Sequence, residues 1–293
     1  MPTNFDDIVF DARSHTYKCG DKSLMPVTTV LKWLTPEFDS ESALASVAFN
    51  TGKTRAQIQV EWDAKRDQGL EKGTRVHAYA EGIIADEDMT LFLALNERLH
   101  EMKQFDIAWS RLRDKLSTKL FKKEWTIGDM EYGIAGRCDA ILQMSVDGNE
   151  RLSLFDWKTG KYTVRKYARG EMMLPPFDDL PNCEEVKYSM QLSLYRLLIE
   201  KNTDIRLHGG YILHLPAESE YVLYNTIDLR DRLDSWLREA IAKGTFGDPD
   251  LEKRANKVSA SLEQFDHKAL AMLSPAARSN LLSKASGLIS RGS

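Results

Sequence analysis

Cysteine is scarce in this chain: only three occur among 293 residues, Cys19, Cys138 and Cys183, and they lie far apart. None belongs to a Cys-x-x-Cys pair, so the spacing excludes the common zinc and iron–sulfur ligand sets. Few, widely spaced thiols are typical of proteins in a reducing compartment. We therefore expect a cytoplasmic protein.

Long apolar runs are missing too. No stretch approaches the length that spans a bilayer, and the N-terminus lacks a charged-then-apolar signal pattern, so we expect no membrane partner. A strong net charge is also absent, since the formal value is −4. Any contact with nucleic acid must therefore come from a local basic groove. The content of 42% hydrophobic and 29% charged residues is that of a soluble globular protein with one large domain or two small ones.

A short strand is predicted at residues 152–160, where apolar residues and an aromatic pair end at Thr159-Gly160. Side chains alternate between the faces of a strand, so Asp156 and Lys158 emerge together at its end. The carboxylate can hold a divalent cation, and the lysine can orient a water or, when neutral, deprotonate it. An isolated Asp-x-Lys is frequent by chance and then marks a solvated ion pair. The rest of the chain must supply the specificity.

A second strand is predicted at residues 132–143, after a strand at 121–127 and a turn at Gly128-Asp129. Gly133 and Gly136 within it indicate close approach of another group. Asp139 has apolar neighbours and needs a cation or hydrogen-bond donors. A turn at residues 147–149 closes a hairpin, so Asp139 and the aspartate of the next strand can converge on one ion.

A helix is expected from residue 73, with Thr74 as its cap. His77 and Glu81 lie four residues apart and therefore on one face. A neutral imidazole is a competent metal ligand, and a nearby carboxylate can orient it or a water. The alternative is a buried histidine that is hydrogen-bonded to the next turn of its own helix.

Residues 161–187 are predicted to be irregular, and basic residues alternate there with tyrosines. This pattern suits a track for single-stranded nucleic acid, where phosphates meet cations and bases stack on rings. An ordinary solvated surface loop is the alternative. A helix follows at 184–201, and one of its faces repeats every four residues. The candidate nucleic-acid-binding residues are Lys161, Tyr162, Arg165, Lys166 and Lys187, and the same helical face continues with Gln191 and Tyr195.

The remaining elements are predicted from apolar spacing. We expect an N-terminal hairpin within residues 5–18, strands at 208–216 and 220–227, and an amphipathic helix at 228–243. Residues 26–31 lead into a helix that Thr28 or Thr29 caps. Residues 40–70 are helical with a break at 50–53, and residues 90–123 form one or two amphipathic helices.

Four of these fragments together resemble the RecB-type branch of the PD-(D/E)XK nuclease superfamily. They occur in the expected order and span residues 73–216, and four weak matches in register make a specific signal. Residues 26–31 also resemble, more loosely, mitochondrial genome-maintenance exonucleases and their phage relatives. The fragments are Gly73-x-x-x-His77-x-x-x-Glu81, Gly136-Arg137-Cys138-Asp139, Asp156-Trp157-Lys158-Thr159-Gly160 and Gln191-x-x-x-Tyr195.

The resemblance implies an α/β protein with a restriction-endonuclease-like core, in which helices flank a mixed central β-sheet. It divides the chain into an N-terminal hairpin and helical segment at 1–70 that could be a lid or arch, a nuclease core at 71–245, and a helical tail at 246–293. It also implies that Lys158 positions the attacking water, while Gln191 and Tyr195 orient the site or the substrate strand. Glu81 matches the catalytic pattern. The implied ligands of Mg²⁺ or Mn²⁺ are His77, Asp139, Asp156 and the main-chain carbonyl of Trp157.

The implied activity is that of a metal-dependent exonuclease that hydrolyses DNA from free ends, with single-stranded DNA as substrate and a role in DNA repair or recombination. A phage-encoded protein of this kind would work in the host cytoplasm. Two alternatives stay open: a structure-specific endonuclease, and a module that binds DNA ends or proteins without cleaving. The chain has neither the cysteine set that holds an iron–sulfur cluster in some relatives nor a GxxxxGK[ST] phosphate loop, so it carries no helicase motor.

Overall fold

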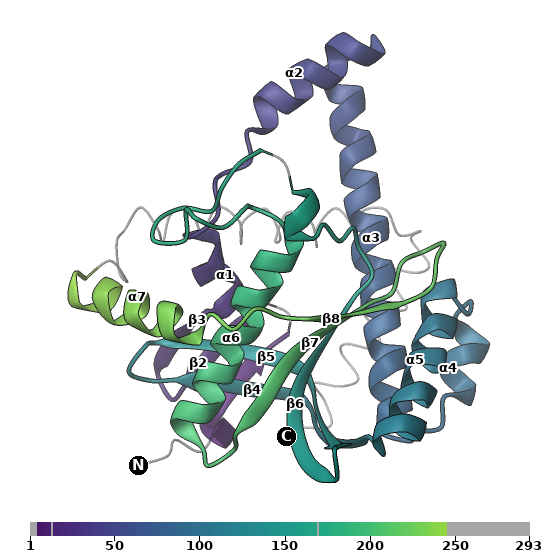
Figure 1. Cartoon of the computed structure of the whole chain (residues 1–293). Helices are drawn as coiled ribbons and strands as arrows, with labels where there is room; N and C mark the ends of the chain where they lie inside the picture. The colour runs from purple at the N-terminus through teal and green to yellow at the C-terminus, as the bar shows by residue number, and fades with distance from the viewer. Residues whose placement is uncertain (1–4, 13, 169, 245–293) are drawn as a thin grey trace, which may run out of the picture. The chain divides into compact units, whose positions relative to one another are not determined.

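The computed structural model describes residues 5–12, 14–168 and 170–244 (Figure 1). The chain divides into two compact units, Met1–Glu239 and Ala240–Ser293. The fold below is that of the first unit. The tail expected at residues 246–293 lies outside the described residues.

One mixed sheet organises the first unit. Its strands follow the order β1-β2-β3-β5-β6-β7-β8, and β4 pairs with β5 beside this path. The pairs β3–β5 and β6–β7 are parallel, whereas the other neighbours are antiparallel. The mixed sheet predicted from the sequence is therefore confirmed. The strands are β1 (Ile8–Asp11), β2 (Thr16–Cys19), β3 (Lys22–Pro26), β4 (Lys119–Asp129), β5 (Ile134–Val146), β6 (Asn149–Lys158), β7 (Leu207–His214) and β8 (Val222–Asn225).

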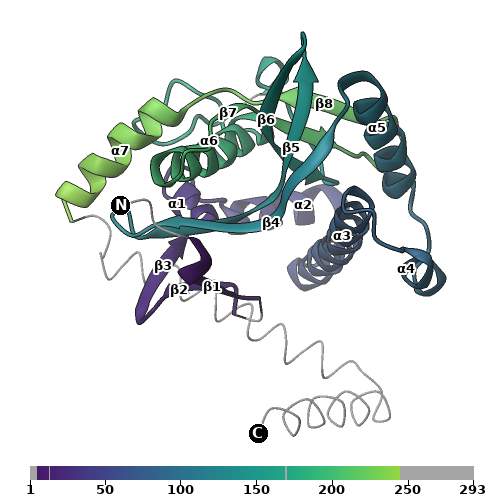
Figure 2. The same cartoon turned by 90° about the horizontal axis from the view of Figure 1, so that it is seen from below.

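Helices lie on both sides of the central strands. In Figure 2, α6 lies on one side of β5 and β6, and α3 and α5 lie on the other. Helix α6 connects the parallel strands β6 and β7, as a crossover between parallel neighbours requires. The helices are α1 (Val27–Lys32), α2 (Ser40–Thr51), α3 (Arg55–Ile84), α4 (Thr90–Leu95), α5 (His100–Leu116), α6 (Glu184–Asn202) and α7 (Arg230–Ala242), with short 3₁₀ turns at Phe5–Asp7 and Arg165–Tyr167.

The core on the α3 and α5 side is rich in aromatic residues. Phe105 of α5 meets the ring of Trp157 edge-on, with ring centroids 5.2 Å apart. Both side chains are almost fully buried, so they fix α5 against β6. The buried Trp157 thus anchors the strand end that carries Asp156 and Lys158. The cluster also includes Val76, Tyr79, Ala80, Ile84, Met102, Ala108, Trp109, Ala140, Leu142, Met144, Phe155, Leu213 and Leu215.

Two glycines allow α6 to approach the sheet closely. A Cβ atom at Gly136 would lie 2.4 Å from Cε1 of Tyr195, and one at Gly210 would lie 3.2 Å from Cδ2 of Leu192. A larger residue at either point would require the neighbouring side chains to shift, including Thr226, whose Oγ1 lies 2.6 Å from the Cβ position of Gly210. The close approach predicted at Gly136 is confirmed. Gly133 instead occupies the turn before β5, where its φ of +67° favours glycine.

Several predicted helix and strand ends were wrong. Helix α3 begins at Arg55 behind a capping box of Thr54 and Gln57 and runs without a break through residue 73, so Thr74 caps nothing. Helix α1 begins at Val27, which places Thr28 and Thr29 inside its first turn. A good cap and a long run of helix formers outweigh the three internal glycines of α3.

The first β-turn of the core also lies later than predicted. Strand β4 continues through Gly128 and Asp129, and the turn follows at residues 130–133. The buried Asp129 carboxylate accepts hydrogen bonds from the Tyr132 amide and the Asn202 side chain. These bonds fix the end of β4 to the turn and to α6. The N-terminal hairpin, the break at 50–53, the strands β7 and β8 and the last helix are confirmed. The three-part division of the chain stays a prediction.

Candidate active site

The β5–β6 hairpin brings two aspartates together. Ala140 pairs with Phe155, so the next residues along the two strands, Asp139 and Asp156, lie opposite each other. Oδ2 of Asp139 accepts a hydrogen bond from the Trp157 amide at 2.9 Å. Positive φ values at Asp147 and Gly148 form the tight turn that sets this register.

His77 connects α3 to the same strand ends. Its Nε2 lies 2.8 Å from the main-chain oxygen of Trp157, and its Nδ1 lies 3.3 Å from Oδ2 of Asp139. Both partners are more than 60 residues away in the sequence. The alternative of a histidine bonded within its own helix is therefore excluded.

Asp156 and Lys158 form a buried ion pair. Nζ of Lys158 lies 2.6 Å from Oδ2 of Asp156, yet the angles are not those of a hydrogen bond, so this buried oxygen has no hydrogen-bond partner. Burial raises the pKa of Asp156 to about 6, against the opposing effect of Lys158 and with a contribution from Asp139. Burial acts to lower the pKa of Lys158, but the negative charges of Asp156 and Asp139 outweigh it and raise that pKa.

Glu124 is a site residue that the sequence analysis missed. Lys123 and Trp125 of β4 pair with Ala140 and Cys138, so Glu124 lies opposite Asp139. Its backbone has a positive φ of 43°. Its Oε2 lies 2.8 Å from Nε of Arg137, which donates a hydrogen bond to the Glu124 main-chain oxygen at 3.1 Å. Burial and then the charge of Asp139 raise the pKa of Glu124 to about 7. The antiparallel strand predicted before Asp139 was the signal that could have revealed it.

Two other predicted groups border this cluster. Glu81 is half-buried one helical turn beyond His77, and its charge also raises the pKa of Glu124. On α6, Nε2 of Gln191 donates to the hydroxyl of Tyr195 at 3.0 Å. Burial raises the pKa of Tyr195, and Asp156 and Asp139 add to that effect, which places the tyrosine beside the acidic pair.

The candidate nucleic-acid-binding residues fall into two groups. Lys161 and Lys166 are exposed on the loop after β6. The other three engage the protein: Nε of Arg165 lies 3.2 Å from Oε1 of Glu185, Nζ of Lys187 lies 3.4 Å from Oε1 of Glu184, and the ring of Tyr162 stacks on Tyr224 at 4.3 Å. Within this set, the two lysines are exposed and neither is paired with a carboxylate of the described residues, although Nζ of Lys166 lies 5.6 Å from the centroid of the Tyr167 ring.

The donor atoms suit a hard divalent cation, because carboxylates, a carbonyl oxygen and an imidazole gather at one strand end. The buried oxygen of Asp156 that lacks a hydrogen bond points to the same use. Within the described residues, however, no three acidic, histidine or cysteine side chains form a ready-made metal site. The carboxylates instead contact side-chain nitrogens of the protein itself, in the pairs Asp156–Lys158, Asp139–His77 and Glu124–Arg137.

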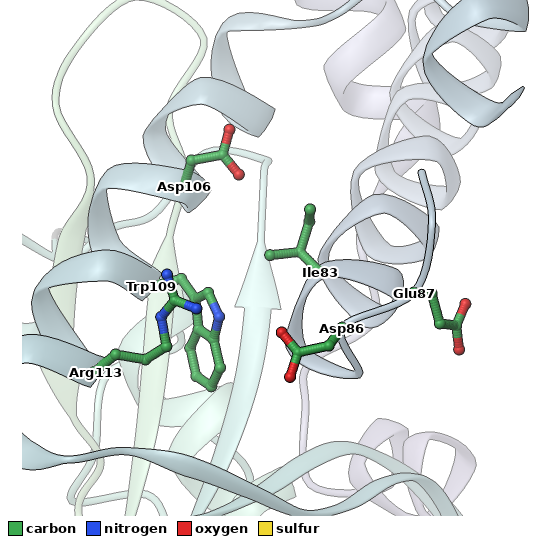
Figure 3. A pocket seen from close by; sticks show the side chains of 6 residues that line it. All are labelled: Ile83, Asp86, Glu87, Asp106, Trp109 and Arg113. Atoms are coloured by element: carbon green, nitrogen blue, oxygen red, sulfur yellow. The ribbon is translucent and has the colours of Figure 1, made fainter. Parts of the chain in front are cut away.

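A separate pocket of about 370 Å³ lies between the end of α3 and α5 (Figure 3). None of the predicted site residues lines it. Nε1 of Trp109, which has no hydrogen-bond partner, is on the side of the indole that faces Asp86 in Figure 3. The pocket is thus distinct from the cluster around Asp156. Its lining residues are Ile83, Asp86, Glu87, Asp106, Trp109 and Arg113.

A family model matches residues 42–258, which include all four motif fragments. The chain belongs to the PD-(D/E)XK nuclease superfamily. This PD-(D/E)XK membership confirms the superfamily and the core fold expected from the sequence. It makes the protein one of a family of nucleases that generally depend on divalent metal ions. Kinship with the RecB-type branch and with the mitochondrial enzymes stays a prediction.

Other comparisons add little to this assignment. A solved structure from Eubacterium rectale, named "Putative exonuclease", is 16% identical with a TM-score of 0.34, over 64% of this chain and 68% of that chain. A likeness at that level carries no argument about function. No match was found among curated proteins. Within the residues that the structure describes, no helix is long and apolar enough to cross a bilayer.

Proposed function

We propose that this PD-(D/E)XK protein is a divalent-metal-dependent exonuclease that hydrolyses single-stranded DNA from free ends. One observation carries the proposal: His77, Asp139, Asp156 and Lys158, drawn from a helix and two strands, meet within contact distance at the end of β6. An acidic pair with a lysine at its rim is the arrangement that metal-assisted phosphodiester hydrolysis needs.

Each group has a role in this scheme. Asp139, Asp156 and the Trp157 carbonyl would hold Mg²⁺ or Mn²⁺, with His77 as a further ligand. The bound ion would stabilise charge on the phosphate oxygens and lower the pKa of the attacking water. Lys158 orients that water as an ammonium, since its pKa is raised, and its close pairing with Asp156 limits where it can point. Gln191 and Tyr195 form a bonded pair that orients the substrate strand.

The preference for an unpaired strand rests on the loop after β6. Its exposed lysines, Lys161 and Lys166, can contact phosphates, and its Tyr162 is part of a cluster of rings close to Lys158. Cations interleaved with aromatic rings suit single-stranded DNA, whose bases are free to stack. A role in repair or recombination, a phage origin and a cytoplasmic location remain predictions from the sequence.

The test uses linear and circular single-stranded DNA of the same sequence, with Mg²⁺ or Mn²⁺. We expect the wild type to shorten end-labelled linear DNA and to leave circles intact, and Lys158→Ala to lose at least about a hundredfold in rate, in line with the size of acid–base contributions. Cleavage that persists unchanged in Lys158→Ala would refute the assigned chemistry.

The same experiment separates the alternatives. Nicking of circles would make the protein an endonuclease on the same site. Binding of DNA without turnover in either metal would make it a non-cleaving module. Each of these results would overturn the proposed exonuclease.

A further inference from the structure

We infer that Tyr188 is a positioning residue that holds Lys158 in place through the face of its ring. The inference rests on the proposed function and adds a residue that the four motifs do not contain. It begins with the side chain of Lys158 itself, whose Nζ lies 4.8 Å from the centroid of the Tyr188 ring. At that distance the negative face of an aromatic ring attracts an ammonium group.

The backbone of Lys158 is already fixed by its neighbours. It pairs with His214 of β7, and its carbonyl accepts from the Leu215 amide at 2.8 Å. The side chain, by contrast, has four rotatable bonds beyond this anchor. Asp156 supplies one contact at 2.6 Å and, by itself, would draw the ammonium onto the carboxylate. A second attraction, from the Tyr188 ring, fixes the direction from which the ammonium meets Asp156.

Tyr188 is itself held in position. It lies on α6 three residues before Gln191 and seven before Tyr195, so all three project from one helical face. The ring of Tyr162 packs beside it, with centroids 5.9 Å apart, and Tyr162 in turn stacks on Tyr224. A row of rings therefore supports the one that faces Lys158. This support favours a single ring orientation, which a positioning contact requires.

The ring and not the hydroxyl makes the contact, which separates positioning from simple packing. Tyr188→Phe keeps the ring face and should keep kcat within about twofold. Tyr188→Leu fills similar space without the ring and should lower kcat about 5- to 30-fold, the range that the strength of such contacts implies, with little change in KM. A side chain that only packed would lower stability and would leave kcat of the folded enzyme unchanged.

A graded series sharpens the test. Phenylalanine analogues with one, two or three ring fluorines at position 188 weaken the negative ring face stepwise at nearly constant size. We expect kcat on linear single-stranded DNA to fall with each fluorine. The same kcat at every fluorine number would overturn the inference even if Tyr188→Leu failed to fold.

A matched control exists at the other end of α6. Nζ of Lys201 lies 4.2 Å from the centroid of the Tyr132 ring, a contact of the same kind at the turn before β5. Tyr132→Leu should lower stability and leave kcat within about twofold. Equal losses of kcat in the two leucine variants would overturn the positioning role. If the wild type cleaves while Tyr188→Leu matches it, the inference fails and the proposed function stands; a wild type that does not cleave refutes both.

Discussion

At the scale of single residues, the acidic groups of the site repel one another unless a cation intervenes. Asp139 raises the pKa of both Asp156 and Glu124, after the larger effect of burial. A raised carboxylate pKa means that the folded state favours the protonated form. The stability that a protonated Asp156 contributes to the metal-free protein is complete below the unfolded pKa of about 3.9. It is lost as the pH rises through the folded pKa of about 6. A bound divalent cation would restore it.

Metal binding should therefore stabilise the protein in a pH-dependent way. We expect Mn²⁺ to raise the Tm at pH 7.5 and to lose this effect progressively below pH 6, because protons compete for Asp156. Thermal melts with and without metal at several pH values measure it. Asp156→Asn is the matched variant and should show no metal-induced shift. A shift of equal size in Asp156→Asn would remove that residue from the ligand set.

A single added methyl group tests how closely α6 approaches the sheet. Gly136→Ala places a Cβ against the Tyr195 ring and should destabilise the protein by about 1–3 kcal/mol, the usual cost of overpacking, while it displaces the Gln191–Tyr195 pair and slows cleavage. Gly69→Ala is the control, because nothing lies within 4 Å of its Cβ position inside α3. That change should stabilise by about 0.5–1 kcal/mol. Chemical unfolding measures both, and equal effects would contradict the close contact.

At the scale of elements, α3 links the N-terminal part of the chain to the site. One continuous helix runs from Arg55 to Ile84 and carries His77 near its end. Its stability starts at the Thr54 cap, where the hydroxyl accepts from the Gln57 amide and the Gln57 side chain accepts from the Thr54 amide. The orientation of His77, a proposed metal ligand, thus depends on a helix whose cap is more than twenty residues away.

The two threonines that compete for the role of cap give a direct test. Thr54→Ala should lower the free energy of unfolding by about 1 kcal/mol, because the Gln57 amide loses the hydroxyl that accepts its hydrogen bond. Thr74→Ala should change it by no more than about 0.5 kcal/mol, because Thr74 is exposed inside the helix. Urea unfolding of both variants decides the matter. The reverse order would mean that the helix begins where the sequence first indicated.

The sequence revealed the elements better than their ends. Alternating apolar residues and the Asp-Gly turn predicted the β5–β6 hairpin, and this alone placed Asp139 beside Asp156. Glu124 escaped because its importance depends on a strand register between β4 and β5, which no local pattern states. The prediction of Thr74 as a helix cap was wrong because the local sequence around a threonine does not distinguish the start of a helix from its interior. The Asp156–Lys158 pair follows from the spacing of the two residues on one strand, whereas the contacts of Asp139 with His77 and of Glu124 with Arg137 are tertiary and had no signal in the sequence.

At the scale of the whole molecule, a formal charge of −4 means that DNA binding must rely on a few local cations. The exposed Lys161 and Lys166 are the candidates, whereas Arg165 is neutralised by Glu185. We expect Lys161→Ala and Lys166→Ala each to reduce the slope of log K against log salt for single-stranded DNA by about 0.7, and Arg165→Ala to reduce it by less. Titrations at several salt concentrations measure the slopes, and a larger effect of Arg165→Ala would contradict this assignment.

The crossover from β6 through α6 to β7 has a consequence for how such an enzyme can diversify. Its two ends are fixed, since β6 and β7 pair along their length and α6 packs on Gly136 and Gly210. The segment between Lys158 and α6 is the longer of the two connections in this crossover, and its described residues hold only a short 3₁₀ turn and an isolated bridge. Insertions or exchanges there would alter which strand is admitted and leave the hydrolytic groups where they are. Substrate choice and bond cleavage can therefore change separately in this architecture.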